Sequence, residues 1–151
     1  MAALPPDVTA ALRRQAPKAL RRDFEREVKK EFDKIKKQMI EEFTSNPITQ
    51  EILAGPDAPN ISGTLSGISN LFAFIGFDRG EEPITPILAL LEKMTIKFQN
   101  EIKRPKIGIR FTVDLPTAED VFAVTPLPWA TGRSWAQGIE RGLSGLGYLL
   151  R

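Results

Sequence analysis

Residues 94–115, MTIKFQNEIKRPKIGIRFTVDL, carry the clearest β-strand pattern of the chain. Apolar and polar side chains alternate in both halves of this stretch, with a break at Arg104-Pro105. The apolar positions are Ile96 and Phe98, followed by Ile107, Ile109, Phe111 and Val113. Alternation with a period of two is typical of a strand with one buried face. We therefore predict an antiparallel hairpin that buries this face and exposes Lys97, Gln99, Arg110 and Thr112.

A long amphipathic helix is predicted on the N-terminal side, between Pro17 and Asn46. Apolar residues recur there at spacings of 4, 4, 4, 3, 4 and 4, namely at Leu20, Phe24, Val28, Phe32, Ile35, Met39 and Phe43. This spacing keeps them on one stripe of a helix. Pro17 suits a first helical turn, and Asn46-Pro47 ends the run. A shorter helix is predicted before it, over residues 6–15.

Shorter elements are predicted around the hairpin. We expect short helices over residues 48–55, 85–92 and 117–124, a loop over residues 56–67, a buried strand over residues 70–77, and a rigid extended link at residues 126–129. In the third helix, Thr117 and Asp120 have the spacing of a capping box. The expected fold class is α+β, a small antiparallel sheet with flanking helices and a long amphipathic N-terminal helix.

The C-terminal segment, residues 132–150, has small residues at helical spacing. Ser134, Gly138, Gly142 and Gly145 are separated by 4, 4 and 3 residues, beside Trp135. Each helical glycine costs about 1 kcal/mol relative to alanine. A seam that lets another backbone approach closely would explain this composition, whereas the alternative is a tail that becomes ordered only on assembly.

Charge divides the chain into a basic helical arm, residues 1–46, and a nearly neutral α+β body, residues 47–151. The arm has eleven basic and eight acidic residues, while the body has ten and eleven. Candidate nucleic-acid contacts in the arm are Arg13, Arg14, Lys18, Arg21 and Arg22, because clustered cations release counterions from phosphates. Interleaved acids favour the simpler interpretation, a solvated helix face.

The chain has no histidine and no cysteine. This excludes thiol and imidazole catalysis and the metal sites that depend on these ligands. The glycine-rich strings lack the Lys-Ser/Thr pair of a phosphate-binding loop. Paired acids are typical of solvated surfaces, so a carboxylate-dependent hydrolase is only a rival hypothesis. We expect no enzymatic activity, no cofactor and no metal site.

The apolar stripe favours contact between subunits over packing within one chain. A helix of roughly 28 residues is about 40 Å long, more than the expected width of the body. We predict a subunit interface formed by Phe24, Val28, Phe32, Ile35 and Phe43 of the arm, with Ser134, Trp135, Gly138 and Gly142 of the C-terminal segment.

Two stretches resemble small structural proteins from the neck and tail-completion region of tailed bacteriophages. They are residues 60–77, NISGTLSGISNLFAFIGF, and residues 132–150, GRSWAQGIERGLSGLGYLL. In those proteins a Ser/Thr-Gly-x-Leu loop follows an arginine-rich helix, and a short sheet precedes a C-terminal Gly-Arg-Ser-Trp helix. The loop pattern corresponds to Ser62, Gly63, Thr64 and Leu65. The resemblance implies an α+β ring subunit between head connector and tail tube, without enzymatic activity.

The resemblance also implies the partners. We expect the chain to pair with itself in a closed ring, a hexamer or a dodecamer, and with neighbouring neck or tail proteins, while DNA passes through the lumen without specific binding. No signal-peptide core or stretch of about 20 apolar residues is present, so we expect no membrane partner. The expected location is the virion, after synthesis in the host cytoplasm. A nucleic-acid-binding module that uses the basic helix is the alternative.

Overall fold

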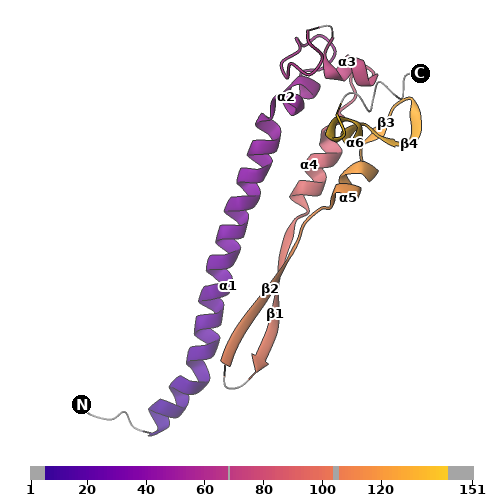
Figure 1. Cartoon of the computed structure of the whole chain (residues 1–151). Helices are drawn as coiled ribbons and strands as arrows, with labels where there is room; N and C mark the ends of the chain where they lie inside the picture. The colour runs from indigo at the N-terminus through magenta and orange to yellow at the C-terminus, as the bar shows by residue number, and fades with distance from the viewer. Residues whose placement is uncertain (1–5, 68, 104–105, 143–151) are drawn as a thin grey trace. The chain divides into compact units, whose positions relative to one another are not determined.

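The computed structural model describes residues 6–67, 69–103 and 106–142 (Figure 1). The chain forms two units, one of residues 1–36 with residues 95–114, the other of residues 37–94 with residues 115–151. We refer to them as the hairpin unit and the core unit. The helices and the two small antiparallel sheets confirm the predicted α+β class.

Helix α1, Pro6–Ser45, is a single helix of 40 residues (Figure 1). The prediction of two helices separated before Pro17 was therefore wrong. An interior proline removes one backbone hydrogen bond and costs about 3 kcal/mol. Residues 10–16 and 18–22 on its two sides are almost entirely Ala, Leu, Arg, Lys and Gln, which are strong helix formers. Their propensity lets the helix continue through the proline.

Helix α2, Pro47–Leu53, follows α1 after a one-residue break. The side chain of Asn46 caps α2 by accepting a 2.9 Å hydrogen bond from the amide of Ile48. Gly55, just beyond the helix, has a φ of +79°. The predicted helix over residues 48–55, the end of α1 at Asn46-Pro47 and the following loop are thus confirmed.

Residues 70–77 form a helix, α3 (Leu71–Ile75), and the predicted buried strand was wrong. The side chain of Asn70 accepts a 2.9 Å hydrogen bond from the amide of Ala73 at the N-terminus. Gly76 closes the C-terminus with a φ of +90°, a conformation that glycine adopts without steric cost. A short apolar run does not by itself distinguish helix from strand, and here the two caps decide.

Helix α4, Thr85–Glu92, is confirmed as predicted. It packs into the core unit through Ile87 and Leu91, which are buried. Among the described residues, the other buried apolar side chains are Ile52, Leu71, Phe72, Ile75, Ile84, Met94, Leu127 and Trp135. The hydrophobic core of the described residues therefore lies in the core unit.

Strands β1 (Thr95–Lys103) and β2 (Lys106–Asp114) form the predicted antiparallel hairpin (Figure 1). Ile96 lies opposite Val113 and Phe98 opposite Phe111, so these apolar residues share one face. The expectation that this face is buried was wrong, because Phe111 and Val113 are exposed. A two-stranded sheet has no second layer of its own to cover an apolar face.

Helix α5, Ala118–Ala123, begins with the predicted capping box of Thr117 and Asp120. The predicted extended link at residues 126–129 was wrong, because β3 (Pro126–Leu127) pairs with β4 (Ala130–Ser134) in a small hairpin. Burial of Leu127 fixes this hairpin on the core. Such long-range contacts cannot be found from a proline-rich sequence alone.

Helix α6 spans only Trp135–Glu140, so within the described residues the small residues of the C-terminal segment do not share one continuous helix. Ser134 precedes the helix as its N-cap, with extended backbone, and Gly142 follows it with a φ of +84°. Of the proposed seam only Gly138 lies within α6, because Ser134 is the N-cap of the helix and Gly142 lies beyond its last residue. Gly145 lies outside the described residues. Within the described ranges, no helix is long and apolar enough to cross a membrane.

Candidate functional site

The apolar stripe of α1 is largely uncovered. Leu20 is 64% exposed, Ile35 56%, Phe24 41% and Met39 36%. Val28, Phe32 and Phe43 are half-buried. A contiguous row of large apolar side chains at the surface marks an interaction site more often than an accident of sequence. The helix therefore presents a surface that a partner could cover.

Several ion pairs lie along the charged side of α1. Arg21 contacts Glu25 at 2.6 Å, Arg26 contacts Asp23 at 3.0 Å, and Lys34 contacts Glu31 at 3.2 Å. Lys18 and Arg22, two of the candidate nucleic-acid contacts, are exposed. Arg21, a third candidate, is the residue paired with Glu25, and the side chains of the remaining two, Arg13 and Arg14, lie outside the described part of the chain. The Arg21–Glu25 pair is half-buried and the other two are exposed. Surface pairs contribute little to stability, but these pairs offset much of the positive charge that would attract phosphate.

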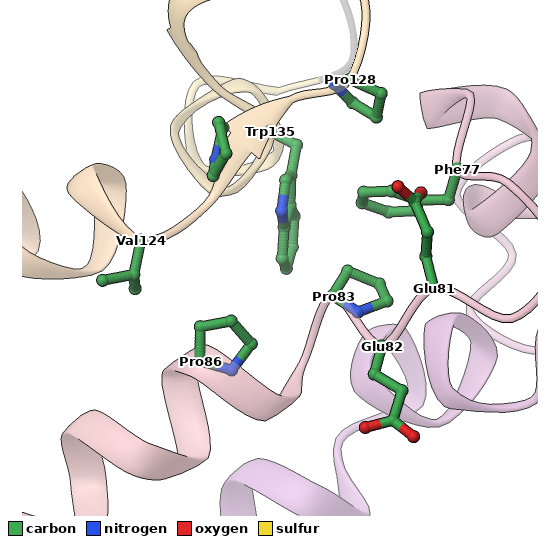
Figure 2. A pocket seen from close by; sticks show the side chains of 9 residues that line it. Phe77, Glu81, Glu82, Pro83, Pro86, Val124, Pro128 and Trp135 are labelled. Atoms are coloured by element: carbon green, nitrogen blue, oxygen red, sulfur yellow. The ribbon is translucent and has the colours of Figure 1, made fainter.

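A first pocket, the Trp135 pocket, lies within the core unit and has a volume of about 280 Å³. Its wall is formed by Phe77, Glu81, Glu82, Pro83, Pro86, Val124, Pro126, Pro128 and Trp135. Figure 2 shows the Trp135 indole in the middle, with Phe77 and Pro83 on one side and Val124 on the other. The rings of Trp135 and Phe77 meet edge to face at 5.8 Å and 89°. The wall is thus apolar and built from rigid groups.

Glu81 and Glu82 supply the only carboxylates of this wall. Both are exposed, and the Glu82 carboxylate points away from the indole (Figure 2). Glu81 Oε2 accepts a 2.9 Å hydrogen bond from the amide of Asp78, and Glu82 Oε2 accepts one of 3.0 Å from the Thr85 hydroxyl. The sequence pattern suggested solvated acids, and the structure adds that they border an apolar hollow.

A second pocket, of about 220 Å³, lies beside α2, α4 and α6. It is lined by Phe43, Asn46, Ile48, Thr49, Ile52, Ile84, Ile87, Trp135, Ala136 and Ile139. Trp135 lines both pockets and is itself buried. Its contribution to any interface is therefore to shape these hollows.

Ser134, another predicted interface residue, is buried in the core unit. Its hydroxyl lies 2.7 Å from the Thr125 hydroxyl and accepts a 3.1 Å hydrogen bond from the amide of Gln137. The amide of Trp135 donates to the Thr125 carbonyl at 2.9 Å. These bonds fix the start of α6 and hence the orientation of the indole.

Glu51, a fully buried carboxylate in α2, was not among the residues predicted from the sequence. Its oxygens accept hydrogen bonds from the amides of Ser62 and Leu71, both at 2.6 Å, and from the Asn60 side chain at 3.0 Å. Burial raises the pKa of Glu51, but these hydrogen bonds outweigh it and hold the pKa below its ordinary value. Because the carboxylate is ionised and fully engaged by the loop, its role is to anchor that loop.

The neighbouring Asn70 side chain has the same role. Its amide nitrogen donates to the carbonyls of Gly55, Pro56 and Ala58 at 3.2, 2.8 and 2.7 Å. Neither residue has a sequence signal that separates it from an exposed polar residue. One weak feature of the sequence does indicate the Trp135 pocket. Prolines are concentrated in two of the segments that form it, residues 83–86 and 126–128.

Within residues 6–67, 69–103 and 106–142, no three or more acidic side chains come together in a way that could hold a metal ion. Comparison with protein-family models, curated proteins and solved structures found no match. The candidate site therefore consists of an apolar helix stripe and an apolar pocket bordered by acids.

Proposed function

We propose that this chain is a structural virion protein that forms a homo-oligomeric ring in the neck or tail-completion region of a tailed bacteriophage and joins the head connector to the tail. The observation that carries the proposal is the exposed apolar stripe of α1 at Leu20, Phe24, Ile35 and Met39. Full burial of a large apolar side chain contributes roughly 1.5–3 kcal/mol. Burial of a stripe of this length would therefore favour association of the subunits.

The proposed location in the neck or tail-completion region rests on the resemblance of residues 60–77 and 132–150 to phage neck proteins. The exposed apolar face of the β1–β2 hairpin adds a second surface that assembly would cover. The ion pairs along α1 fit a conduit for DNA, because unbalanced cations in a lumen would hold the DNA tightly.

Purified protein tests the proposal. We expect gel filtration with light scattering, followed by electron microscopy, to find closed rings, and to find the same rings in purified particles of a phage that encodes the chain. We expect duplex DNA to bind weakly at physiological salt, in the micromolar range or poorer. A monomer that binds a specific DNA sequence at nanomolar concentration, and that is missing from phage particles, would instead establish the nucleic-acid-binding alternative.

A further inference from the structure

We infer that the Trp135 pocket of one copy receives residues 18–24 of α1 from a second copy, so that the ring closes through contacts between two unlike surfaces. We refer to residues 18–24, KALRRDF, as the arm segment. The inference rests on the proposed function and specifies how its subunits meet. Contacts between unlike surfaces generate rings when the rotation from copy to copy closes.

The pocket has the properties of a receptor for side chains. Its volume of about 280 Å³ falls just below the range of about 300–1,000 Å³ that is usual for small-molecule sites. Pro83 and Pro86 give it stiff walls, and Phe77 is held by its ring contact with buried Trp135. A preformed apolar hollow of this size binds an apolar anchor with little loss of conformational freedom.

The arm segment supplies such an anchor. Leu20 and Phe24 are four residues apart and both are exposed, so they lie on one face of α1, one turn apart. Leu20 is the most exposed large apolar side chain of the described residues. Aromatic and aliphatic side chains that enter a partner's pocket typically dominate the energy of an interface.

Charge supports this pairing. Lys18, Arg21 and Arg22 outnumber Asp23 in the arm segment, whereas Glu81 and Glu82 border the pocket. Arg21 is already held by Glu25, and Lys18 and Arg22 are exposed. Opposite charges around an apolar contact fix its orientation and speed association. The acidic border therefore favours a basic apolar segment over a neutral or acidic one.

The proposed ring makes a second copy the source of the arm segment. Each copy carries both the arm segment, in which Leu20 and Phe24 are exposed, and the pocket, which Glu81 and Glu82 border. A closed ring of identical copies can therefore engage every arm segment and every pocket.

Three double variants test the contact, each altering one surface. The arm variant is Leu20→Ser with Phe24→Ser, and the pocket variant is Glu81→Lys with Glu82→Lys. Lys30→Ser, on the charged side of α1, and Glu140→Lys, an exposed position at the end of α6 that lines neither pocket, are the matched controls. A milder pocket variant, Glu81→Gln with Glu82→Gln, keeps the two hydrogen-bond acceptors and removes only the charge. Circular dichroism and urea titration establish that each variant is folded.

We expect the arm variant and either pocket variant to lower the association constant of assembly by about tenfold or more, as measured by sedimentation velocity. The controls should assemble like the parent chain. Mixing arm and pocket variants in equal amounts should give a one-to-one heterodimer in native mass spectrometry and nothing larger, because the pair retains one intact arm and one intact pocket.

The outcomes separate this inference from the proposed function. Absence of the heterodimer, or assembly of a folded pocket variant at the parent's affinity, would overturn the inference while rings of the parent chain would leave the proposed function standing. A parent chain that forms no ring, alone or in phage particles, would overturn both.

Discussion

The indole nitrogen of Trp129 donates a 2.7 Å hydrogen bond to the carbonyl oxygen of Ile75, the last residue of α3. The bond ties the turn between β3 and β4 to a helix 54 residues earlier in the chain. Gly76 lies against the indole, because a Cβ atom added there would come to 3.0 Å from Trp129 Cδ1. The fold around the Trp135 pocket therefore depends on a residue without a side chain at position 76.

Gly76→Ala should lower the free energy of unfolding. The φ of +90° alone costs an L-residue roughly 1–2 kcal/mol, and the contact with Trp129 adds to this cost. Urea denaturation measures the difference. Gly80→Ala is the matched control, because Gly80 has a φ of +97° but open space at its Cβ position. Equal losses in the two variants would show that Trp129 makes no steric demand at Gly76.

Glu51→Gln should destabilise the protein at pH 7 by about 1–3 kcal/mol, because the amide group cannot accept all the hydrogen bonds that the carboxylate accepts. The pKa of Glu51 lies below its ordinary value of 4.5 in the folded chain. Its ionised form therefore contributes stability above pH 4.5, and this contribution is lost as the pH falls through the folded pKa.

The pH dependence gives a second readout for Glu51. We expect the unfolding free energy of the parent chain to fall below about pH 4.5 and that of Glu51→Gln to fall less steeply, in urea titrations at pH 7, 5, 4 and 3. Glu140→Gln, at an exposed position, should follow the parent curve. Parallel curves for parent and Glu51→Gln would mean that the buried carboxylate does not act through its charge.

Phe24→Ser with Phe32→Ser should weaken assembly more than it destabilises the chain. Phe24 is exposed and Phe32 is half-buried, so neither belongs to the core, whereas burial at an interface would yield roughly 1.5–3 kcal/mol per side chain. Sedimentation velocity and thermal unfolding separate the two effects. Lys30→Ser with Lys34→Ser, on the charged side, serves as the control. Normal assembly of the phenylalanine variant would exclude this stripe from the interface.

Pro17→Ala should stabilise α1. Proline costs about 3 kcal/mol in a helix interior, mainly through its missing amide hydrogen and a steric clash. Amide hydrogen exchange should become slower in the N-terminal turns of the helix, and the helical signal in circular dichroism should rise. Ala19→Gly should act in the opposite direction, by about 1 kcal/mol. An unchanged exchange rate after Pro17→Ala would show that the helix does not run through position 17.

Elements defined by local pattern could be predicted from the sequence. The alternation around Phe98 and Phe111 predicted the hairpin and its shared apolar face, and Thr117 with Asp120 predicted a helix start that the structure confirms. The stripe of α1 was likewise visible as a period of three and four residues. These features depend on neighbours within a few positions, so sequence spacing contains the necessary information.

Tertiary structure decided the rest, because it depends on groups far apart in the chain. The proline-rich turn became a hairpin held by the hydrogen bond between Trp129 and Ile75, whereas the helix at residues 70–77 depends on local caps at Asn70 and Gly76 that the strand prediction did not take into account. Glu51 is an ordinary helix residue until a loop more than ten residues away supplies its hydrogen-bond donors. By itself the sequence determined which faces are apolar; only packing determined which of them are covered, and it left the arm stripe exposed and the Trp135 pocket open.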